Sequence, residues 1–348
     1  MTRSHHISKL LDRQRGVVVI WFALLLPVLL GFAALAVDLA RLGMIKAELQ
    51  NAADAAALGG ARSLSDPGGE PYNWSAATVA AEDFARRNSA NAARIRDVAV
   101  ETGYWNLPDP SLGFRDTLTT PVAGDLPAVQ VTVAITSTRN NGPVRFFFAP
   151  FLGIEESDIQ ASATAVLPAP EGGTGMFPFA FNDCILSSLW DSDTNSPALD
   201  GSGNPIIFRI QDPYPDASCY AGEWTTFDTP ANNVPAIRDL MDDGNTTPLS
   251  VGDPTWILPG TKATLYQKVK NEFIGKEVPI VVVDNIPGKK GWQTITAIIG
   301  FKITGASHKG KNKYVEGHFI SNEIFGGLDP GSGNGTPLGA YTPPVLVR

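Results

Sequence analysis

The longest uninterrupted apolar stretch of the sequence lies close to its start. Residues 17–37, VVVIWFALLLPVLLGFAALAV, run for 21 positions without a charged side chain. A helix of this length, at about 1.5 Å per residue, crosses a hydrocarbon core of roughly 30 Å. Pro27 and Gly31 lie inside the stretch, and membrane helices tolerate both, although Pro27 is expected to bend this one. The pattern predicts a transmembrane helix over residues 16–37.

A cleaved secretory signal peptide is the alternative interpretation of this stretch. The apolar core of such a peptide spans about 7–15 residues and ends at a cleavage site of small residues. Here the apolar run is longer, and it continues directly into Asp38-Leu39-Ala40-Arg41 and a further helical pattern. An uncleaved anchor therefore fits the sequence better.

Basic residues are unequally distributed about the predicted membrane helix. Four lie among the first fifteen positions, whereas only Arg41 and Lys46 follow within the next twenty. The positive-inside rule therefore makes residues 1–15 a cytoplasmic stub and puts the rest of the chain outside the cytoplasm.

Strong helix formers extend the predicted helix beyond the membrane as a stalk over residues 38–66, where Asp66-Pro67-Gly68-Gly69 ends the pattern. Ala52, Ala56 and Gly60 are four residues apart and share one stripe of this stalk. Small residues at this spacing let helix backbones approach closely. We interpret the stripe as a helix-packing face that contacts either another stalk helix, which would give an oligomer, or the chain's own domain.

Helical and strand patterns are mixed in residues 70–168. A helix is expected over 75–88, and strands are expected over 97–104, 128–138 and 157–166. Apolar and polar residues alternate from Val129 to Thr136, which is the period of a half-buried strand. This segment predicts a small α+β domain.

An aromatic cluster, VRFFFAPFLGI, occupies residues 144–154 of the same segment. One interpretation is a contact with a membrane surface or a partner. The favoured interpretation is a short helix or turn that fills the local core.

The second half of the chain has strand patterns in place of helical ones. Residues 169–175 are a linker by composition, and residues 176–325 predict a β-rich domain with two short helices, over 235–243 and 262–269. Residues 326–348 are rich in Gly and Pro and are expected to form a flexible tail. The fold class is therefore α+β: a single N-terminal transmembrane helix continuing into a helical stalk, a small α+β unit, then a β-rich domain.

Composition narrows the function. Hydrophobic residues make up 43% of the chain and charged residues 18%, which excludes a disordered protein. The net charge is −8, and an acidic body argues against a nucleic-acid partner. Lys309, Lys311 and Lys313 are the densest basic run, and they are interleaved with Gly and Asn, as in a solvated hairpin tip.

The chain has two cysteines, Cys184 and Cys219, both far beyond the predicted membrane helix. In an oxidising compartment a disulfide is their natural pairing. It would close a loop of about 35 residues and stabilise the fold by up to about 4 kcal/mol in the chain-entropy model. Two buried free thiols are the alternative.

Signals for catalysis are few. Of four histidines, His5 and His6 lie in the cytoplasmic stub, His308 neighbours the basic run, and His318 lies in a strand pattern. A hydrolase using His318 is conceivable, but no nucleophile elbow, zinc helix, P-loop or dinucleotide fingerprint supports it. We therefore predict no enzyme, no catalytic residue and no cofactor.

One acidic segment has the start of a calcium loop. Asp191, Asp193 and Asn195 stand at positions 1, 3 and 5, with Asp200 further on. Serines occupy the positions where an EF-hand has its glycine and its bidentate glutamate. A weak calcium site is one interpretation, and a solvated acidic loop is the favoured one, so no metal site is assigned.

Several features coincide in residues 13–64: a basic RQRG start, a FALLLP core, a VDLAR exit and the stretch LQNAADAAAL. With them the segment resembles the N-terminal region of TadE/TadG-like assembly proteins of Flp (tight adherence) pili. Residues 221–261 and the YVEGHFI stretch resemble the downstream part of TadG-related proteins.

The resemblance implies a non-enzymatic, membrane-anchored component of a Tad pilus, with a role in adhesion. It also implies that the protein lies in the inner membrane with most of its chain in the periplasm. The implied partners are the lipid bilayer and other Tad components of the membrane or envelope. Trp21 stands where pilin-like subunits carry a Glu, five residues after Gly16, so polymerisation as a pilin is not implied. A metal motif of von Willebrand type, D-x-S-x-S, is not found. The alternative function is a membrane-anchored binding module, for calcium or glycan, unrelated to pili.

Overall fold

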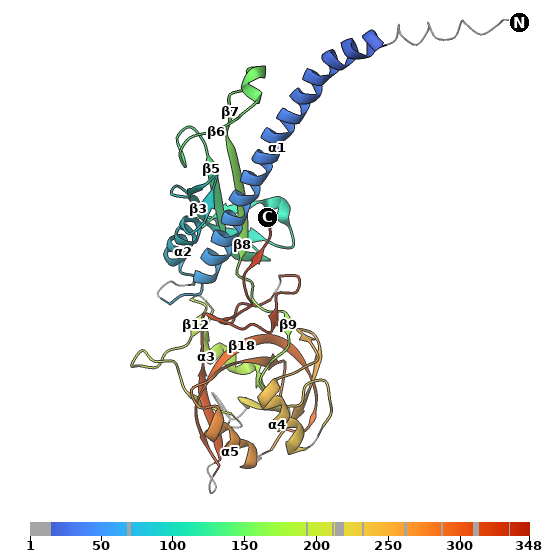
Figure 1. Ribbon diagram of the computed structural model, residues 1–348. Helices are drawn as coiled ribbons and strands as arrows, with labels where there is room; N and C mark the ends of the chain where they lie inside the picture. The colour runs from blue at the N-terminus through green and yellow to red at the C-terminus, as the bar shows by residue number, and fades with distance from the viewer. Residues whose placement is uncertain are drawn as a thin grey trace, which may run out of the picture. The chain divides into compact units, whose positions relative to one another are not determined.

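The computed structural model describes residues 15–67, 71–192, 194–210, 212, 219–231, 233–260, 263–286, 288–308, 313–333 and 335–348 (Figure 1). The chain forms two compact units. The first consists of residues 1–53, 85–98 and 132–161, and the second of residues 54–84, 99–131 and 162–348. Four of the boundaries between the units, after residues 53, 84, 131 and 161, fall inside a helix or strand and do not interrupt it. The class is α+β, as the sequence predicts.

Helix α1 (Arg15–Ser63) is one continuous helix of 49 residues with Pro27 inside it. The predicted membrane helix and stalk are thus a single element, which confirms the long apolar N-terminal helix. Among the described residues, this helix alone is long and apolar enough to cross a membrane, with a mean hydropathy of 2.7 in its most apolar window and none of that window buried. The basic stub, residues 1–14, lies outside the described residues.

The first unit adds two small antiparallel hairpins to its part of α1. One joins β1 (Ser89–Ala90) to β2 (Ala93–Arg94), and the other joins β6 (Val144–Arg145) to β7 (Glu156–Ser157). Asn91 and Ala92 form the tight turn of the first hairpin, both with positive φ. The tip of the second contains the 3-10 helix η2 (Ala149–Leu152).

A five-stranded sheet with the order β23-β8-β5-β3-β4 belongs mostly to the second unit, and residues 132–135 and 159–161 at the ends of two of its strands are counted with the first. Its strands are β3 (Ala99–Asn106), β4 (Phe114–Asp116), β5 (Asp125–Ile135), β8 (Ile159–Val166) and β23 (Val345–Leu346). Helix α2 (Trp74–Arg86) precedes β3, and the 3-10 helix η1 (Pro110–Leu112) lies between β3 and β4. The expected helix and three strands of this segment all form, with shifted ends, because their periodicity is strong.

A closed ring of five strands dominates the rest of the second unit. The long strand β18 pairs with β17 along one edge and with β16 and β19 along the other. β16, β14, β10 and β17 continue the pairing around the ring, and β10 and β17 are parallel. The strands are β10 (Phe179–Asn182), β14 (Gly222–Thr225), β16 (Pro254–Leu258), β17 (Glu277–Val283) and β18 (Gly291–Ser307), extended by β19 (Tyr314–Phe319) and β13 (Phe208–Arg209).

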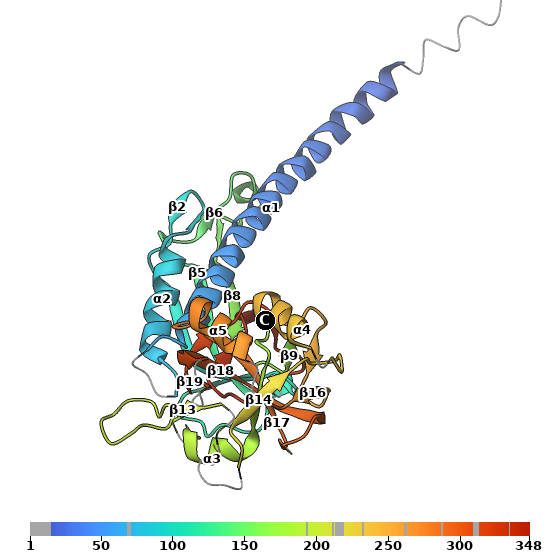
Figure 2. The ribbon, with the colours of Figure 1, turned by 90° about the horizontal axis from the view of Figure 1, so that it is seen from below.

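Two helices, α4 (Val234–Asp243) and α5 (Ala263–Glu272), lie side by side against this ring (Figure 2). Ile237 and Met241 of α4 and Tyr266 of α5 share one core with Trp224 of β14. The ring of Phe181 lies within 5.0 to 5.5 Å, centroid to centroid, of its aromatic neighbours Phe208, Phe301 and Phe319. The second unit therefore has an aromatic core of its own.

The remaining short elements of the second unit are the 3-10 helix η3 (Asp183–Ile185), α3 (Leu186–Leu189) and the hairpin of β11 (Trp190–Asp191) with β12 (Ser196–Pro197). The expected linker, residues 169–175, contains β9 (Gly172–Gly173), which pairs with β15 (Leu249–Ser250) and β21 (Leu328–Asp329). Glycine is required there because a Cβ on Gly173, whose φ is +135°, would meet the backbone of Gly327.

Residues 326–348 carry regular structure, contrary to the expected flexible tail. Besides β21 and β23, they supply β22 (Ala340–Tyr341), which pairs in parallel with β20 (Glu323–Ile324). Leu328, Leu338 and Tyr341 are buried. The Gly and Pro residues therefore form turns between short strands, each of which has an apolar anchor.

Candidate functional site

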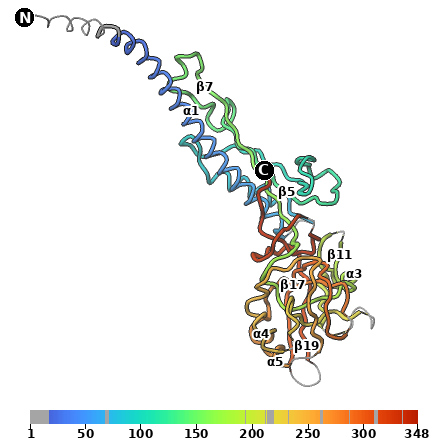
Figure 3. Tube along the Cα trace, turned by 90° about the vertical axis from the view of Figure 1, so that its right-hand side faces the viewer, coloured from blue at the N-terminus to red at the C-terminus, as the bar shows by residue number. Residues whose placement is uncertain are grey.

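Asp38, the first charged residue after the apolar segment of α1, ties the β6–β7 hairpin to the helix. Its carboxylate accepts hydrogen bonds from the backbone N–H groups of Phe147, Phe148 and Ala149, each at 2.8 Å. The side chain is buried, with the residue 1% exposed. The hairpin lies alongside α1 in both views of this part of the chain (Figures 1 and 3). Asp38 therefore fixes the start of η2 to the end of the apolar segment.

The charge of this carboxylate is set by opposing effects. Burial opposes ionisation of Asp38, but the three N–H donors and the nearby Arg41 outweigh it and lower its pKa. Asp38 is therefore ionised at neutral pH.

Arg41, one turn further along α1, makes a second set of contacts with the same unit. Its guanidinium donates to the carbonyl oxygen of Arg145 at 2.6 Å and to Oδ1 of Asn91 at 2.9 Å. It also lies over the ring of Phe147, 4.6 Å from the centroid. Glu48 accepts from the N–H of Asn91 at 2.8 Å. The charged residues just beyond the apolar segment thus hold both hairpins of the first unit.

The aromatic cluster of residues 144–154 does not fill a core, and the favoured interpretation was wrong on this point. A short 3-10 helix does form, but Phe147 is 63% exposed, Phe151 89% and Leu152 69%. The reason is that hydrogen bonds to Asp38, and not packing of the aromatic rings, hold this turn. Phe148, Phe151 and Leu152 instead form one side of an open apolar groove of about 510 Å³, whose other side is α1 from Val28 to Leu35.

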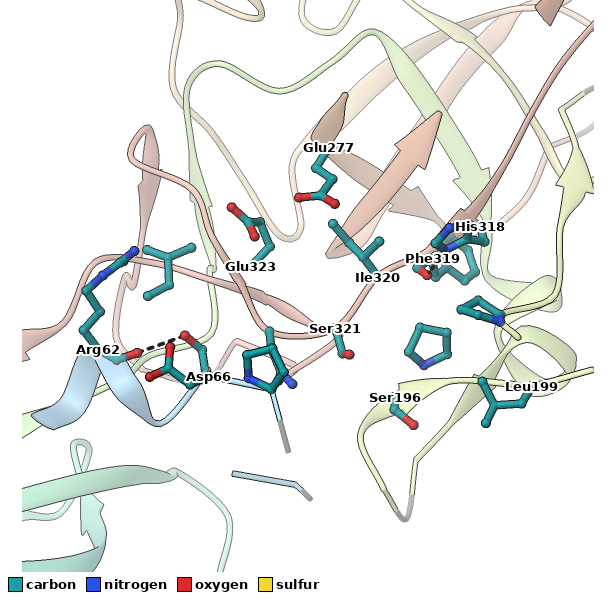
Figure 4. Close-up of a pocket in the computed structure, with 16 residues that line it drawn as sticks. Arg62, Asp66, Ser196, Leu199, Glu277, His318, Phe319, Ile320, Ser321 and Glu323 are labelled. Atoms are coloured by element: carbon teal, nitrogen blue, oxygen red, sulfur yellow. Dashed lines mark hydrogen bonds between the residues drawn. The ribbon is translucent and has the colours of Figure 1, made fainter. Parts of the chain in front are cut away.

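A pocket of about 560 Å³ in the second unit contains His318, the one histidine considered for catalysis (Figure 4). Ser321, Glu277 and Glu323 also line it. Burial, then the neighbouring Glu277 carboxylate, raises the pKa of Glu323. Nδ1 of His318 lies 2.8 Å from the carbonyl oxygen of Phe319, its own neighbour in sequence. Across the described residues, no hydrogen bond joins His318 to a serine or a carboxylate, so the pocket holds no assembled triad.

The residues of the calcium interpretation do not converge. Oδ1 of Asp191 lies 3.4 Å from the N–H of Thr194, and Asp193 lies outside the described residues. Asn195 is buried and donates to the hydroxyl of Tyr341 at 2.9 Å. Backbone N–H groups, first that of Asn204, lower the pKa of Asp200 by closing a turn on it. In the part of the chain that the structure describes, no three His, Cys, Asp or Glu side chains gather as metal ligands.

A disulfide joins Cys184 and Cys219, whose Cα atoms are 6.1 Å apart, which confirms the expected pairing. It connects η3 to the segment just before β14, and Cys219 belongs to the core of the ring.

The expected helix-packing face is covered by the chain itself. Ala52 and Ala56 have no exposed surface. A Cβ on Gly60 would lie 2.9 Å from the Cβ of Ala81 and 3.0 Å from Cγ1 of Val129. The small residues thus allow close packing against α1, as their spacing suggests. At Gly60 the elements that pack against α1 are α2 and β5. We do not propose an oligomer through this stripe.

Two family models match the chain. The TadE/G-like Flp pilus-assembly family matches residues 16–63, and a Tad-like Flp pilus-assembly family matches residues 59–165. Over residues 16–165 the chain is therefore similar to Flp pilus-assembly proteins, and over residues 16–63 to the TadE/G-like ones. No curated protein and no solved structure matches it.

The TadE/G-like match contains Asp38 and Arg41, and the Tad-like match contains the aromatic hairpin. The resemblance expected for residues 13–64 is confirmed. The expected resemblance of the second half to TadG-related proteins stays a prediction, because neither match extends beyond residue 165.

Sequence reasoning recognised the VDLAR exit as a family feature but missed the role of Asp38. The only signal was a carboxylate directly after an apolar segment, with an uncharged aromatic run elsewhere in the chain. Asn245 was missed as well: its side chain accepts from the N–H of Met176 and donates to the carbonyl oxygens of Gly173 and Thr247.

Proposed function

We propose that this protein is a non-enzymatic structural component of Tad pilus assembly, anchored in the inner membrane by α1. The anchor is the apolar segment of α1; the residues before it lie in the cytoplasm, and the part of the chain that follows it lies in the periplasm. The other Tad components of the membrane or envelope are its partners.

The exposed apolar half of α1 carries the membrane anchorage, and the matches to Flp pilus-assembly families support the role in pilus assembly. Large side chains on all faces of the segment, among them Trp21, Leu24 and Phe32, are more than 60% exposed. A helix that is apolar all round is stable when a bilayer covers it. The excess of basic residues before the segment supports a cytoplasmic N-terminus. The disulfide in the second unit fits an oxidising periplasm.

A pilus count by electron microscopy on a clean deletion strain tests the proposal. Deletion should remove pili, and the wild-type gene should restore them. A double variant, Leu25→Arg with Leu29→Arg, should fail to restore them, because each charge near the middle of a membrane helix costs about 2.5–3.5 kcal/mol on insertion. Leu118→Arg is the matched control, since Leu118 is 92% exposed in a loop of the second unit, and it should complement fully.

Three further variants sharpen the experiment. His318→Ala should restore pili if the role is structural. Trp21→Glu introduces the glutamate that pilin-like subunits carry at this position, and so tests whether pilus formation requires its absence from this protein. Leu118→Cys should react with a membrane-impermeant maleimide in cells whose outer membrane is permeabilised, as a periplasmic residue must. A deletion strain with a normal number of pili would refute the proposed function.

A further inference from the structure

We propose that the tip of the β6–β7 hairpin, residues 146–154, is a second membrane contact that inserts into the outer-leaflet interface beside α1. This aromatic tip, FFFAPFLGI, is the uncharged stretch between Arg145 and Glu155. The inference rests on the proposed membrane anchorage of α1 and goes beyond it, because a single spanning helix requires no second contact.

The position of the aromatic tip along α1 is the first argument. The apolar groove pairs Phe148, Phe151 and Leu152 with α1 from Val28 to Leu35, the last part of the apolar segment. Phe32 precedes Asp38 by six residues, or about 9 Å along a helix. Interfacial apolar faces are buried about 5–10 Å into the boundary between headgroups and acyl chains. If lipid surrounds this end of the anchor, it therefore surrounds the tip as well.

The backbone of the tip is the second argument. In a bilayer, backbone N–H groups need partners within the protein because water is absent. Asp38 accepts three of them, from Phe147, Phe148 and Ala149. The N–H groups of Phe146, Phe151, Gly153 and Ile154 donate to carbonyl oxygens within the hairpin, and Pro150 has no N–H. The tip thus meets the main requirement for irregular backbone at a membrane surface.

The distribution of charge is the third argument. Most of the large apolar side chains at the tip are exposed, among them Phe147, Phe151 and Leu152, and the exposed residues at its base, Arg145, Glu155 and Glu156, are charged. The guanidinium of Arg41 lies over Phe147, between the tip and the base. Exposed apolar side chains at the tip and charged side chains at its base match the order of groups across a membrane interface. These features favour lipid over a protein as the occupant of the tip.

Spin-label depth measurements on the full-length protein in vesicles of phosphatidylethanolamine and phosphatidylglycerol test this. Single cysteines replace Leu24 in the anchor, Phe151 in the tip and Leu118 in the exposed loop. A maleimide spin label leaves the native disulfide intact. Power saturation then compares accessibility to oxygen, which concentrates in lipid, with accessibility to a water-soluble nickel complex. None of the three substitutions removes a buried side chain, since all three positions are more than 60% exposed.

The expected result is that the ratio of oxygen to nickel accessibility for the label at position 151 lies closer to that at position 24 than to that at position 118. A label at 24 in lipid with a label at 151 in water would overturn the membrane contact and leave the anchor intact, assigning the aromatic tip to a protein partner. Labels at both 24 and 151 in water would overturn the anchor as well, and with it the proposed function.

Discussion

The two units of this protein treat their large apolar side chains in opposite ways. In the first unit, Trp21, Phe32 and Phe151 are each more than 60% exposed, whereas in the second unit Trp224, Phe179 and Phe301 have no exposed surface. The first unit exposes its aromatic side chains along a helix and at a hairpin tip. The second unit encloses its aromatic side chains within a closed ring of strands.

The contrast shows that the two regions are stabilised by different means. The second unit buries its own hydrophobic core and has a disulfide, so its fold is stabilised within the unit itself. In the first unit, a buried carboxylate and an arginine tie the hairpins to a helix whose apolar surface needs another environment. Apolar residues therefore indicate burial, but they do not tell whether protein or lipid provides it.

The largest expected effect is on the second unit and comes from removal of its disulfide. Cys184→Ala with Cys219→Ala should lower the free energy of unfolding by about 2–4 kcal/mol, because the unfolded chain regains the freedom of a closed loop. Denaturation followed by tryptophan fluorescence measures this. Wild-type protein unfolded in the presence of a reductant is the control and should match the variant. An unchanged midpoint would show that the ring of strands needs no covalent support.

Two glycines of α1 should respond differently to replacement by a larger residue. Gly60→Leu should destabilise the fold by about 1–3 kcal/mol, since the added atoms meet Ala77, Ala81 and Val129. Gly31→Leu is the matched control, because a Cβ at Gly31 meets nothing within 4 Å. Thermal unfolding of both variants in detergent gives the comparison. Equal effects would mean that the two halves of α1 do not differ in packing.

Loss of the Asn245 side chain is expected to lower the stability of the second unit by a smaller amount. Asn245→Ala leaves the N–H of Met176 and the carbonyl oxygen of Gly173 without their partner, and should cost about 1–2 kcal/mol. Asn204→Ala, at an exposed turn, should have almost no effect in the same urea titration. A loss as large for Asn204 would contradict the assignment.

The smallest expected effect is local to the first unit and depends on pH. Because the pKa of Asp38 is lowered from its ordinary value of 3.8, its contribution to the hairpin is present above that value. It is lost as pH falls through the lowered pKa. Hydrogen exchange in residues 144–154 should therefore lose protection only in strong acid in the wild type. The same exchange should already be fast at neutral pH in Asp38→Asn.

Asp158→Asn, an exposed carboxylate near the base of the same hairpin, is the control for that experiment and should exchange as the wild type does. If Asp38→Asn also retained full protection, packing and not the carboxylate would hold the hairpin, and the contrast between the two units would weaken.

The sequence alone determined the elements that depend on local periodicity. The 21 uncharged residues give α1 its apolar half, and the alternation in residues 128–138 gives most of β5. The RQRG, VDLAR and LQNAADAAAL stretches were sufficient for the TadE/TadG-like resemblance. The two cysteines, far from the anchor, favoured the disulfide over two free thiols, and the structure confirms it.

Tertiary structure alone decided the positions of groups that are distant in sequence. Asp38 and Phe147 are 109 residues apart, and no local pattern pairs a carboxylate with those N–H groups. The strands of residues 169–175 and 326–348 were missed because Gly-rich segments have no periodicity, and β9 pairs with partners more than 70 residues away. The aromatic tip was misread for a related reason: hydrophobicity gives the free energy of leaving water, whereas the rest of the fold decides which apolar surroundings are within reach.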